Sequence, residues 1–390
     1  MNLIRGVRFS TIDRLGTISL FSSFAVAMVV TIWAIYLDSF FHNAAYVGFF
    51  AAALTITGII SYIFLNPIVE KGNKANLYAL TILIYIISYF LFAFFPNIYI
   101  IIALGILISI IGSLRITLFG IIIRDKTKDC SVAKTEGLIY TLSNLSWLVA
   151  PVVAGFIASR YGIREVFILS AMILLIASIL FKFFKIKDSR KTKVDKNLLA
   201  PIKEFFKNKK RIYAYFLGGG IDLWWSLIYI YIPIYIFELG LNEKIIGYFL
   251  GAIVIPLIFT EYYFGKRAGK KGFKKLFIMG YSILGIAALS IFFISNIYLI
   301  LLILILASFG AGMLEPTTEA YFFDIITPKQ RDKFYGPYNT TADLNAFLGR
   351  ALPAVILLIF PFKTIFIFFG VAMLIFALIS SRAKEIIEKK

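Results

Sequence analysis

The chain has 390 residues, of which 60% are hydrophobic and 16% charged, and its formal net charge is +19. Soluble domains are about 45–50% apolar and about 25% charged, so this composition excludes a soluble globular fold and a disordered chain. A lone Cys130 excludes an internal disulfide, and a single His42 excludes a Cys/His metal cluster. We therefore expect no metal and no cofactor.

Apolar runs between charges, prolines and asparagines predict twelve membrane-spanning helices. Twelve spans of ~20 residues need about 240 residues, which is close to the apolar content. We expect an all-α polytopic membrane protein. The spans are predicted at 15–37, 45–69, 77–95, 98–123, 137–159 and 165–184 in the first half, and at 212–237, 244–264, 275–294, 297–324, 335–359 and 363–381 in the second.

A long polar stretch, 185–211, separates the two sets of six and is interpreted as a cytoplasmic linker. We therefore expect an N-terminal six-helix bundle over 1–184 and a C-terminal one over 212–390. Very short connections at Phe95-Pro96-Asn97 and Ser295-Asn296 predict antiparallel neighbouring helices.

The positive charge lies almost entirely on one side of these spans. With the N-terminus inside, 34 of the 40 Lys and Arg residues fall on the inner side. Basic residues collect on the cytoplasmic side of membrane proteins, so both termini are predicted to be cytoplasmic. A basic chain also raises nucleic acid as a partner, but this sidedness removes the reason to expect one.

The two halves repeat at an offset of 199 residues. Gly48 corresponds to Gly247, and Gly137 corresponds to Gly336. Leu145, Leu148, Arg164 and Phe167 have similar or identical counterparts at the same offset. Tandem six-helix repeats are the architecture that alternating access uses, in which two similar bundles rock around a midplane site.

Three segments point to a known family. The fifth span carries Gly137-x8-Ser146-x3-Ala150-Pro151-x2-Ala154-Gly155, the connection after the eighth reads Gly265-Lys-Arg267-Ala-Gly269-Lys270-Lys271, and the tenth is followed by Asp324-x3-Pro328-x2-Arg331. With the 6+6 layout, these resemble the major facilitator superfamily, in particular its twelve-helix drug and metabolite:proton antiporters.

The pattern in the fifth span is similar to the antiporter signature of that superfamily. Gly137, Pro151 and Gly155 match it, while Ala150 and Ala154 replace glycine with another small residue. Small residues on one face let helices approach closely and proline bends a span. The resemblance implies an exporter, and the alternative interpretation is generic small-residue packing.

Two inner connections are similar to the gating loops of the family. Arg267, Gly269 and Lys270 match the loop motif after the eighth span, and Glu70 with Lys71 is the counterpart after the second. The resemblance implies a gating role. The alternative is that both segments only anchor the chain as positive inner loops.

Ionisable residues inside the spans are costly, at about 2.5–3.5 kcal/mol or more at the bilayer centre. The spans hold Asp222, Glu315, Glu319, Asp343, Arg115 and Arg350, and Glu261 lies near the inner end of the eighth span. Our hypothesis is that Asp222, Glu315 and Asp343 carry protons, and that the two arginines pair with them in one conformation. The alternative is that they form fixed ion pairs between helices.

Four aromatic residues are placed to line a cavity: Trp33 and Tyr36 on the first span, and Trp225 and Tyr229 on the seventh. An acidic, aromatic-lined cavity suits a lipophilic cation or a neutral amphiphile.

The sequence therefore predicts a secondary transporter and not an enzyme. We expect a monomeric, multi-pass protein of the cell membrane that exports small amphiphilic or drug-like molecules in exchange for protons. A symporter or uniporter for a sugar or organic anion, with Arg115 and Arg350 as anion ligands, stays open. A lipid-modifying membrane enzyme would need clustered aspartates, which do not occur here.

Overall fold

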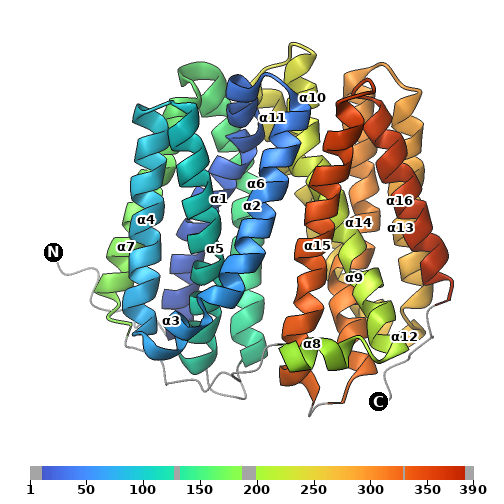
Figure 1. The fold of residues 1–390 in the computed structure, drawn as a ribbon, viewed down its shortest axis with the longest axis horizontal. Coiled ribbons are helices and arrows are strands. Elements are labelled where there is room, and N and C mark those ends of the chain that lie inside the picture. The colour runs from blue at the N-terminus through green and yellow to red at the C-terminus, as the bar shows by residue number, and fades with distance from the viewer. Residues whose placement is uncertain (1–10, 127–131, 187–198, 328–329, 383–390) are drawn as a thin grey trace. The chain divides into compact units, whose positions relative to one another are not determined.

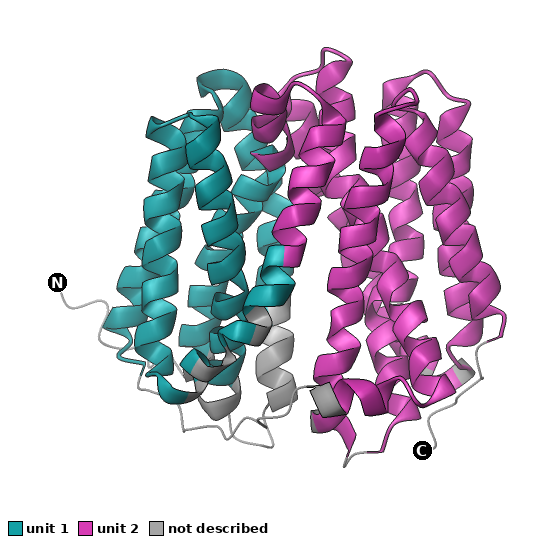
Figure 2. Cartoon of the chain, viewed as in Figure 1, with its two compact units in different colours: residues 1–32, 57–194 teal, residues 33–56, 195–390 magenta. Residues whose placement is uncertain are grey.

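The computed structural model describes residues 11–126, 132–186, 199–327 and 330–382, and these stretches are helical, joined by short turns (Figure 1). The chain divides into two compact units (Figure 2). Unit 1 comprises residues 1–32 and 57–194, and unit 2 comprises residues 33–56 and 195–390.

Two helices contribute to both units, because the unit boundaries fall inside them. These are α1 (Thr11–Phe41) and α2 (Ala44–Phe64). The rest of unit 1 is built from five helices, of which α4 packs against both α5 and α7. They are α3 (Asn66–Lys71), α4 (Lys74–Phe94), α5 (Ile98–Lys126), α6 (Val132–Tyr161) and α7 (Ile163–Phe183).

Unit 2 packs α9 against α15, α12 against α14, and α13 against both α14 and α16. Its elements are α8 (Leu199–Phe205), α9 (Lys209–Ser226), the π-helical turn η2 (Leu227–Tyr231), α10 (Ile232–Glu238), α11 (Glu243–Ala252), α12 (Val254–Lys271), α13 (Lys274–Phe292), α14 (Ile297–Ile325), α15 (Arg331–Leu357) and α16 (Thr364–Ser380).

Asparagine side chains begin several of these helices. Asn73 accepts a hydrogen bond from the backbone N–H of Asn76 (2.8 Å), and Asn296 accepts one from that of Tyr298 (2.9 Å). Such caps satisfy N–H groups that the first turn leaves unpaired. The very short connections predicted at 95–97 and 295–296 are confirmed.

The helix boundaries repeat at the sequence offset. Helix α5 spans 98–126 and α14 spans 297–325, so both ends differ by 199. Helices α6 and α15 begin at 132 and 331, which is the same offset. The contacts repeat too, because α4 packs on α5 and α7 as α13 packs on α14 and α16.

Ten helical stretches in the described residues are long and apolar enough to cross a membrane. The expected last span is the 17-residue apolar helix Thr364–Ser380, which is shorter than these ten. Helix α15 has 27 residues but carries many polar ones and is not among them. A count of twelve spans and the cytoplasmic termini therefore stay predictions.

Prolines break three spans that the sequence predicted as continuous. The span 45–69 ends at Phe64, and Pro67 lies in the first turn of α3. The span 244–264 is divided at Ile253, just before Pro256. Pro233 follows η2 and cannot donate to the carbonyl of Tyr229, so the seventh span has a π-helical turn there.

The predicted linker is also partly ordered. Helix α8 lies within it, and Phe205 at its end is buried among aromatic side chains that include Phe334. Arg211 donates to the carbonyl oxygens of Phe205 (3.1 Å) and Glu204 (2.6 Å), which satisfies the end of α8.

Candidate transport site

Glu315 is the centre of a polar cluster inside unit 2. Its Oε1 accepts a 3.1 Å hydrogen bond from Trp225 Nε1, which joins α14 to α9. The carboxyl group of Glu261, from α12, lies within hydrogen-bonding reach of the Glu315 carboxyl. Two carboxyl groups form such a bond only when one of them holds a proton.

Trp225 also packs against Tyr229, with ring centroids 5.6 Å apart. Asp222 lies one turn before Ser226 on the same helix, and the Ser226 hydroxyl lies close enough to donate to its carbonyl (3.2 Å) or to that of Ala346 on α15 (3.3 Å). Asp222, Trp225 and Tyr229 are all half-buried. Asp222 thus lies on the same helical stretch as the aromatic faces of Trp225 and Tyr229.

Arg350 interacts electrostatically with Asp222 and Asp343, but it does not form an ion pair with either within 4.0 Å. Its Nη1 instead donates to Thr55 Oγ1 (2.6 Å) and to the carbonyl oxygen of Ala51 (3.3 Å), both on α2. Its Nε is buried without a hydrogen-bond partner. The alternative of a fixed Arg350–carboxylate ion pair is therefore not seen in this conformation, and the proton-carrying role of the carboxylates stays a prediction.

Asp343 and Glu319 are exposed in the structure, in contrast to Glu315. Glu319 lies one turn from Glu315 along α14 and is an electrostatic neighbour of Tyr338. Neither side chain is therefore enclosed as the Glu315 side chain is.

Arg115 is held by tyrosines in unit 1. Its guanidinium lies over the Tyr85 ring, 5.2 Å from the centroid, and its buried Nε has no hydrogen-bond partner. The electrostatic neighbours of Arg115 are Tyr78, Tyr85 and Tyr89, all on α4. The structure therefore surrounds Arg115 with hydroxyls, and an acid partner for it stays a prediction.

Trp33 and Tyr36 contact each other on α1, with ring centroids 6.1 Å apart. Tyr36 also packs edge-on against Phe40 at 5.2 Å. Tyr36 is buried, whereas Trp33 is half-buried. Their role as cavity residues stays a prediction.

The small residues of α6 form a packing face. Ala150, Pro151, Ala154 and Gly155 are buried. One turn away, the Ser146 hydroxyl is placed to donate to the carbonyl of Leu20 on α1 (3.0 Å). Gly137 lies in α6, but its surroundings fall outside what the structure describes. The Ser146 bond joins α6 to α1, and the gating role of this motif stays a prediction.

The segment interpreted as a gating loop after the eighth span is helical, which corrects the sequence prediction. Arg267, Gly269 and Lys270 lie in the last turns of α12, which ends before Gly272, a glycine at φ 84°. Arg267 Nη1 donates to the hydroxyl of Tyr263, one turn earlier (2.9 Å). The polar end of a helix that extends beyond its apolar span is easily predicted as a loop, because its hydropathy is low although its backbone is still helical.

Glu70 and Lys71 end the short helix α3, and Lys71 is exposed. The side chain of Glu70 falls outside the described residues. The proposed pairing of this acid and base therefore stays a prediction.

Sequence reasoning missed the glycine triplet 218–220 of α9. A Cβ on Gly218 would lie 2.5 Å from the Tyr338 hydroxyl, and one on Gly219 would overlap the Asn345 amide. Three successive glycines in an apolar span are a detectable signal of close helix approach.

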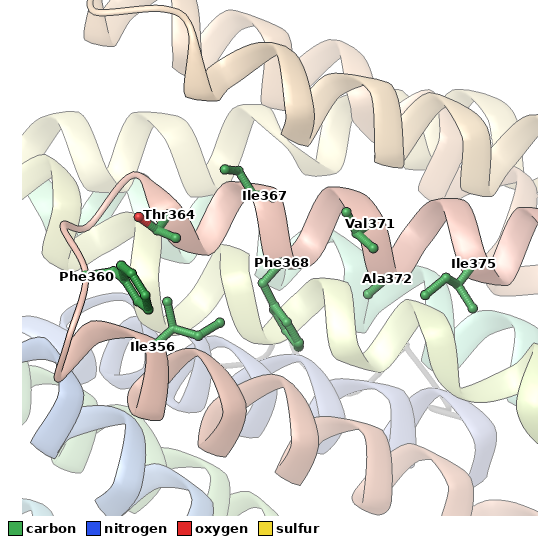
Figure 3. Close-up of a pocket in the computed structure, with 8 residues that line it drawn as sticks. All are labelled: Ile356, Phe360, Thr364, Ile367, Phe368, Val371, Ala372 and Ile375. Carbon is green, nitrogen blue, oxygen red and sulfur yellow. The ribbon is translucent and has the colours of Figure 1, made fainter.

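An apolar pocket of about 510 Å³ lies between α16 and the end of α15 (Figure 3). Its lining includes Ile356, Phe360, Phe368 and Ala372, and the Thr364 hydroxyl is the polar group beside them. It offers no carboxylate or cation, so it is not the site where a proton or a polar substrate binds.

A repeated set of apolar helices with carboxylates in its interior defines a multi-pass membrane transporter of small molecules. The family model of the Major Facilitator Superfamily matches residues 15–293 and 223–385. The chain belongs to this superfamily, whose members are transporters and not enzymes.

Two curated relatives are sugar transporters. The chain is 27% identical over 236 residues to "Sugar efflux transporter B" of Salmonella typhimurium, a match that covers 58% of each protein and therefore less than two thirds of that relative. It is 21% identical to "Sugar efflux transporter A" of Dickeya chrysanthemi over 84% of each protein.

Solved structures share the fold. A POT family transporter in complex with a thioalcohol-conjugated peptide aligns with a TM-score of 0.78 at 12% identity, covering 94% of each chain. The nucleoside transporter NupG aligns with a TM-score of 0.76 at 13% identity, covering 95% of this chain and 98% of that one.

Proposed function

We propose that the protein is a proton-coupled exporter of small sugars or similarly polar amphiphiles. It works in the cell membrane, as a monomer with cytoplasmic termini. The observation that carries the proposal is the Glu315 cluster, in which a carboxyl from α14 meets Trp225 of α9 and Glu261 of α12.

Proton coupling is supported by the chemistry of this cluster. A hydrogen bond between Glu261 and Glu315 holds a proton, and loss of that proton places two negative charges side by side. Like charges in a low-dielectric interior repel strongly. Deprotonation therefore drives the helices that carry them apart, which links proton release to a change of shape.

The substrate class is supported by the neighbouring groups. Trp225 and Tyr229 offer aromatic faces for the apolar face of a sugar ring, and Asp222 offers acceptors for its hydroxyls. The names of the two curated relatives favour sugars over a lipophilic cation, and they favour export. The small-residue pattern of α6 also favours an antiporter.

Transport assays in proteoliposomes test the proposal. Radiolabelled mono- and disaccharides are loaded, a pH gradient is imposed, and flux is followed with and without a protonophore. We expect sugar to move in the direction opposite to the flow of protons. The variants Glu315→Gln and Asp222→Asn should abolish this sugar flux while their protein yield is unchanged. The matched control is Glu165→Gln, a half-buried carboxylate at the start of α7.

Two results would change the assignment. Flux in the same direction as the protons identifies a symporter, and flux that ignores the gradient identifies a uniporter. If both Glu315→Gln and Asp222→Asn show gradient-driven flux of normal size, these two residues have no part in proton coupling.

A further inference from the structure

The π-helical turn η2 lies inside the seventh predicted span, next to the Glu315 cluster. In this turn the backbone N–H of Ile232 donates to the carbonyl oxygen of Leu227, five residues earlier, which is the hydrogen bond of a π-helix. Single π-helical turns within α-helices occur frequently at functional sites. The turn begins directly after Ser226 and contains Tyr229, so it belongs to the same helical stretch as the candidate site.

Pro233 leaves one buried carbonyl oxygen of η2 without a main-chain donor. In a helix the carbonyl oxygen of Ile228 accepts from the N–H of residue 232 or of residue 233. The N–H of Ile232 is bonded to Leu227, and Pro233 has no N–H. Ile228 is fully buried, so water does not replace the missing donor. An unfavourable backbone arrangement that a structure retains in this way points to a role in function.

The wide turn lets two side chains that are five residues apart reach the same neighbouring helix. The Ser226 hydroxyl lies 3.3 Å from the carbonyl oxygen of Ala346 on α15, and the Tyr231 hydroxyl donates to that of Arg350 on α15 (2.5 Å). In an α-helix five residues turn by about 500°, so Ser226 and Tyr231 would point about 140° apart. The π-helical turn removes most of this difference, and both side chains therefore lie on α15.

The same turn determines where the Tyr229 ring lies. Tyr229 is half-buried, whereas the other four residues of η2 are buried. Its ring packs against Trp225 with the centroids 5.6 Å apart, and Glu315 is its electrostatic neighbour. Because Ser226 and Tyr231 hold one side of the helix on α15, Tyr229 is held beside the Glu315 cluster.

We propose that Pro233 is a positioning residue for transport. By withholding an N–H it preserves the π-helical turn, and the turn holds the Tyr229 ring against Trp225 and beside Glu315. Pro233 thus acts through Tyr229 and needs no contact with the substrate. The proposal rests on the proposed transport function, but its geometry can be tested without a transport assay.

The variant Pro233→Ala tests the geometry. Alanine supplies an N–H, which lets the turn close as an α-helix and moves Tyr229 relative to Trp225. The chain has four tryptophans, and protein labelled with 5-fluorotryptophan reports the surroundings of each by fluorine NMR. The signal that disappears in Trp225→Phe identifies Trp225. The matched control is Pro337→Ala, which replaces another proline inside a helix of unit 2.

We expect the Trp225 signal to shift in Pro233→Ala and to stay in place in Pro337→Ala. We also expect Pro233→Ala to unfold in detergent at the same temperature as the wild type or at a higher one, because the new N–H satisfies a buried acceptor. An unmoved Trp225 signal would overturn the proposal. A lower unfolding temperature would also overturn it, since Pro233 would then act by holding the fold together.

A double variant connects this geometry to transport. Tyr229→Leu removes the aromatic ring, and Pro233→Ala misplaces it, so we expect each to lower the proton-driven rate in proteoliposomes about fivefold. If Pro233 acts through Tyr229, the double variant is no slower than Tyr229→Leu alone. A further fivefold fall in the double variant would show that the two residues act independently and would overturn the proposal. A wild-type chain without proton-driven transport would instead contradict the proposed function, and the fluorine spectra do not depend on that result.

Discussion

Trp225 donates its indole N–H to Glu315 across 3.1 Å, and this bond joins the seventh and tenth predicted spans. Trp225→Phe keeps the aromatic face beside Tyr229 and removes the donor. A hydrogen bond to a charged group contributes about 1.5–3 kcal/mol, so we expect the proton-driven transport rate to fall about tenfold. The measurement is the initial rate in proteoliposomes at matched protein content. A wild-type rate would show that the bond has no part in coupling.

The close approach of α9 to α15 predicts a large effect of a single methyl group. A Cβ on Gly219 would overlap the Asn345 amide and lie 2.5 Å from Thr341 Oγ1, so we expect Gly219→Ala to cost about 1–3 kcal/mol. A Cβ on Gly120 meets no atom within 4 Å. Gly120→Ala should stabilise α5 by about 0.5–1 kcal/mol. Thermal unfolding of both variants in detergent checks this, and a smaller effect at Gly219 than at Gly120 would contradict the packing.

The ion pair between Glu204 of α8 and Lys333 of α15 predicts a pH effect. Their charged atoms are 2.6 Å apart, and the hydrogen bond from Lys333 lowers the pKa of Glu204 below its ordinary value. A carboxyl group with a lowered pKa stabilises the folded state above its unfolded pKa, and this contribution is lost as the pH falls through the folded pKa. Glu204→Gln should therefore unfold at a lower temperature than the wild type at pH 7, and at the same temperature near pH 3.

The difference at pH 7 should be small, below about 2 °C, because both side chains are exposed and solvent screens the pair. Lys210→Gln, which removes an exposed charge that does not act on Glu204, is the control. A Glu204→Gln deficit that persists at pH 3 would mean that the side chain acts by packing and not by its charge.

Arg115 is predicted to act in folding. Arg115→Lys keeps the charge but loses the planar group that lies over the Tyr85 ring, and we expect a loss of about 1–2 kcal/mol in stability. Transport per folded molecule should be unchanged. If the Arg115→Lys variant has normal stability but has lost transport, Arg115 acts as a substrate ligand and not in folding. Thermal unfolding and flux measured on the same preparation separate these results.

Much of the fold was predictable because apolar runs and asparagine caps are local signals. The span predicted at 98–123 is α5, which begins at Ile98 directly after Asn97. The pairing of Glu261 with Glu315 was not predictable, because it depends on how α12 packs against α14. The bond of Arg350 to Thr55 joins residues 295 positions apart, and a neutral threonine carries no signal of such a role.

Helix α2 has a consequence for how the protein can be recombined. Its residues up to Ile56 belong with helices encoded more than 150 positions later, so the two repeats are not interchangeable modules. A hybrid that joins the first 186 residues of a relative to residues 199–390 of this chain sets a foreign helix against Arg350 and Ala354, which contact Thr55 and Gly48 in this chain. Only a donor that also supplies a glycine at 48 and a hydroxyl at 55 would give a hybrid with a matched interface.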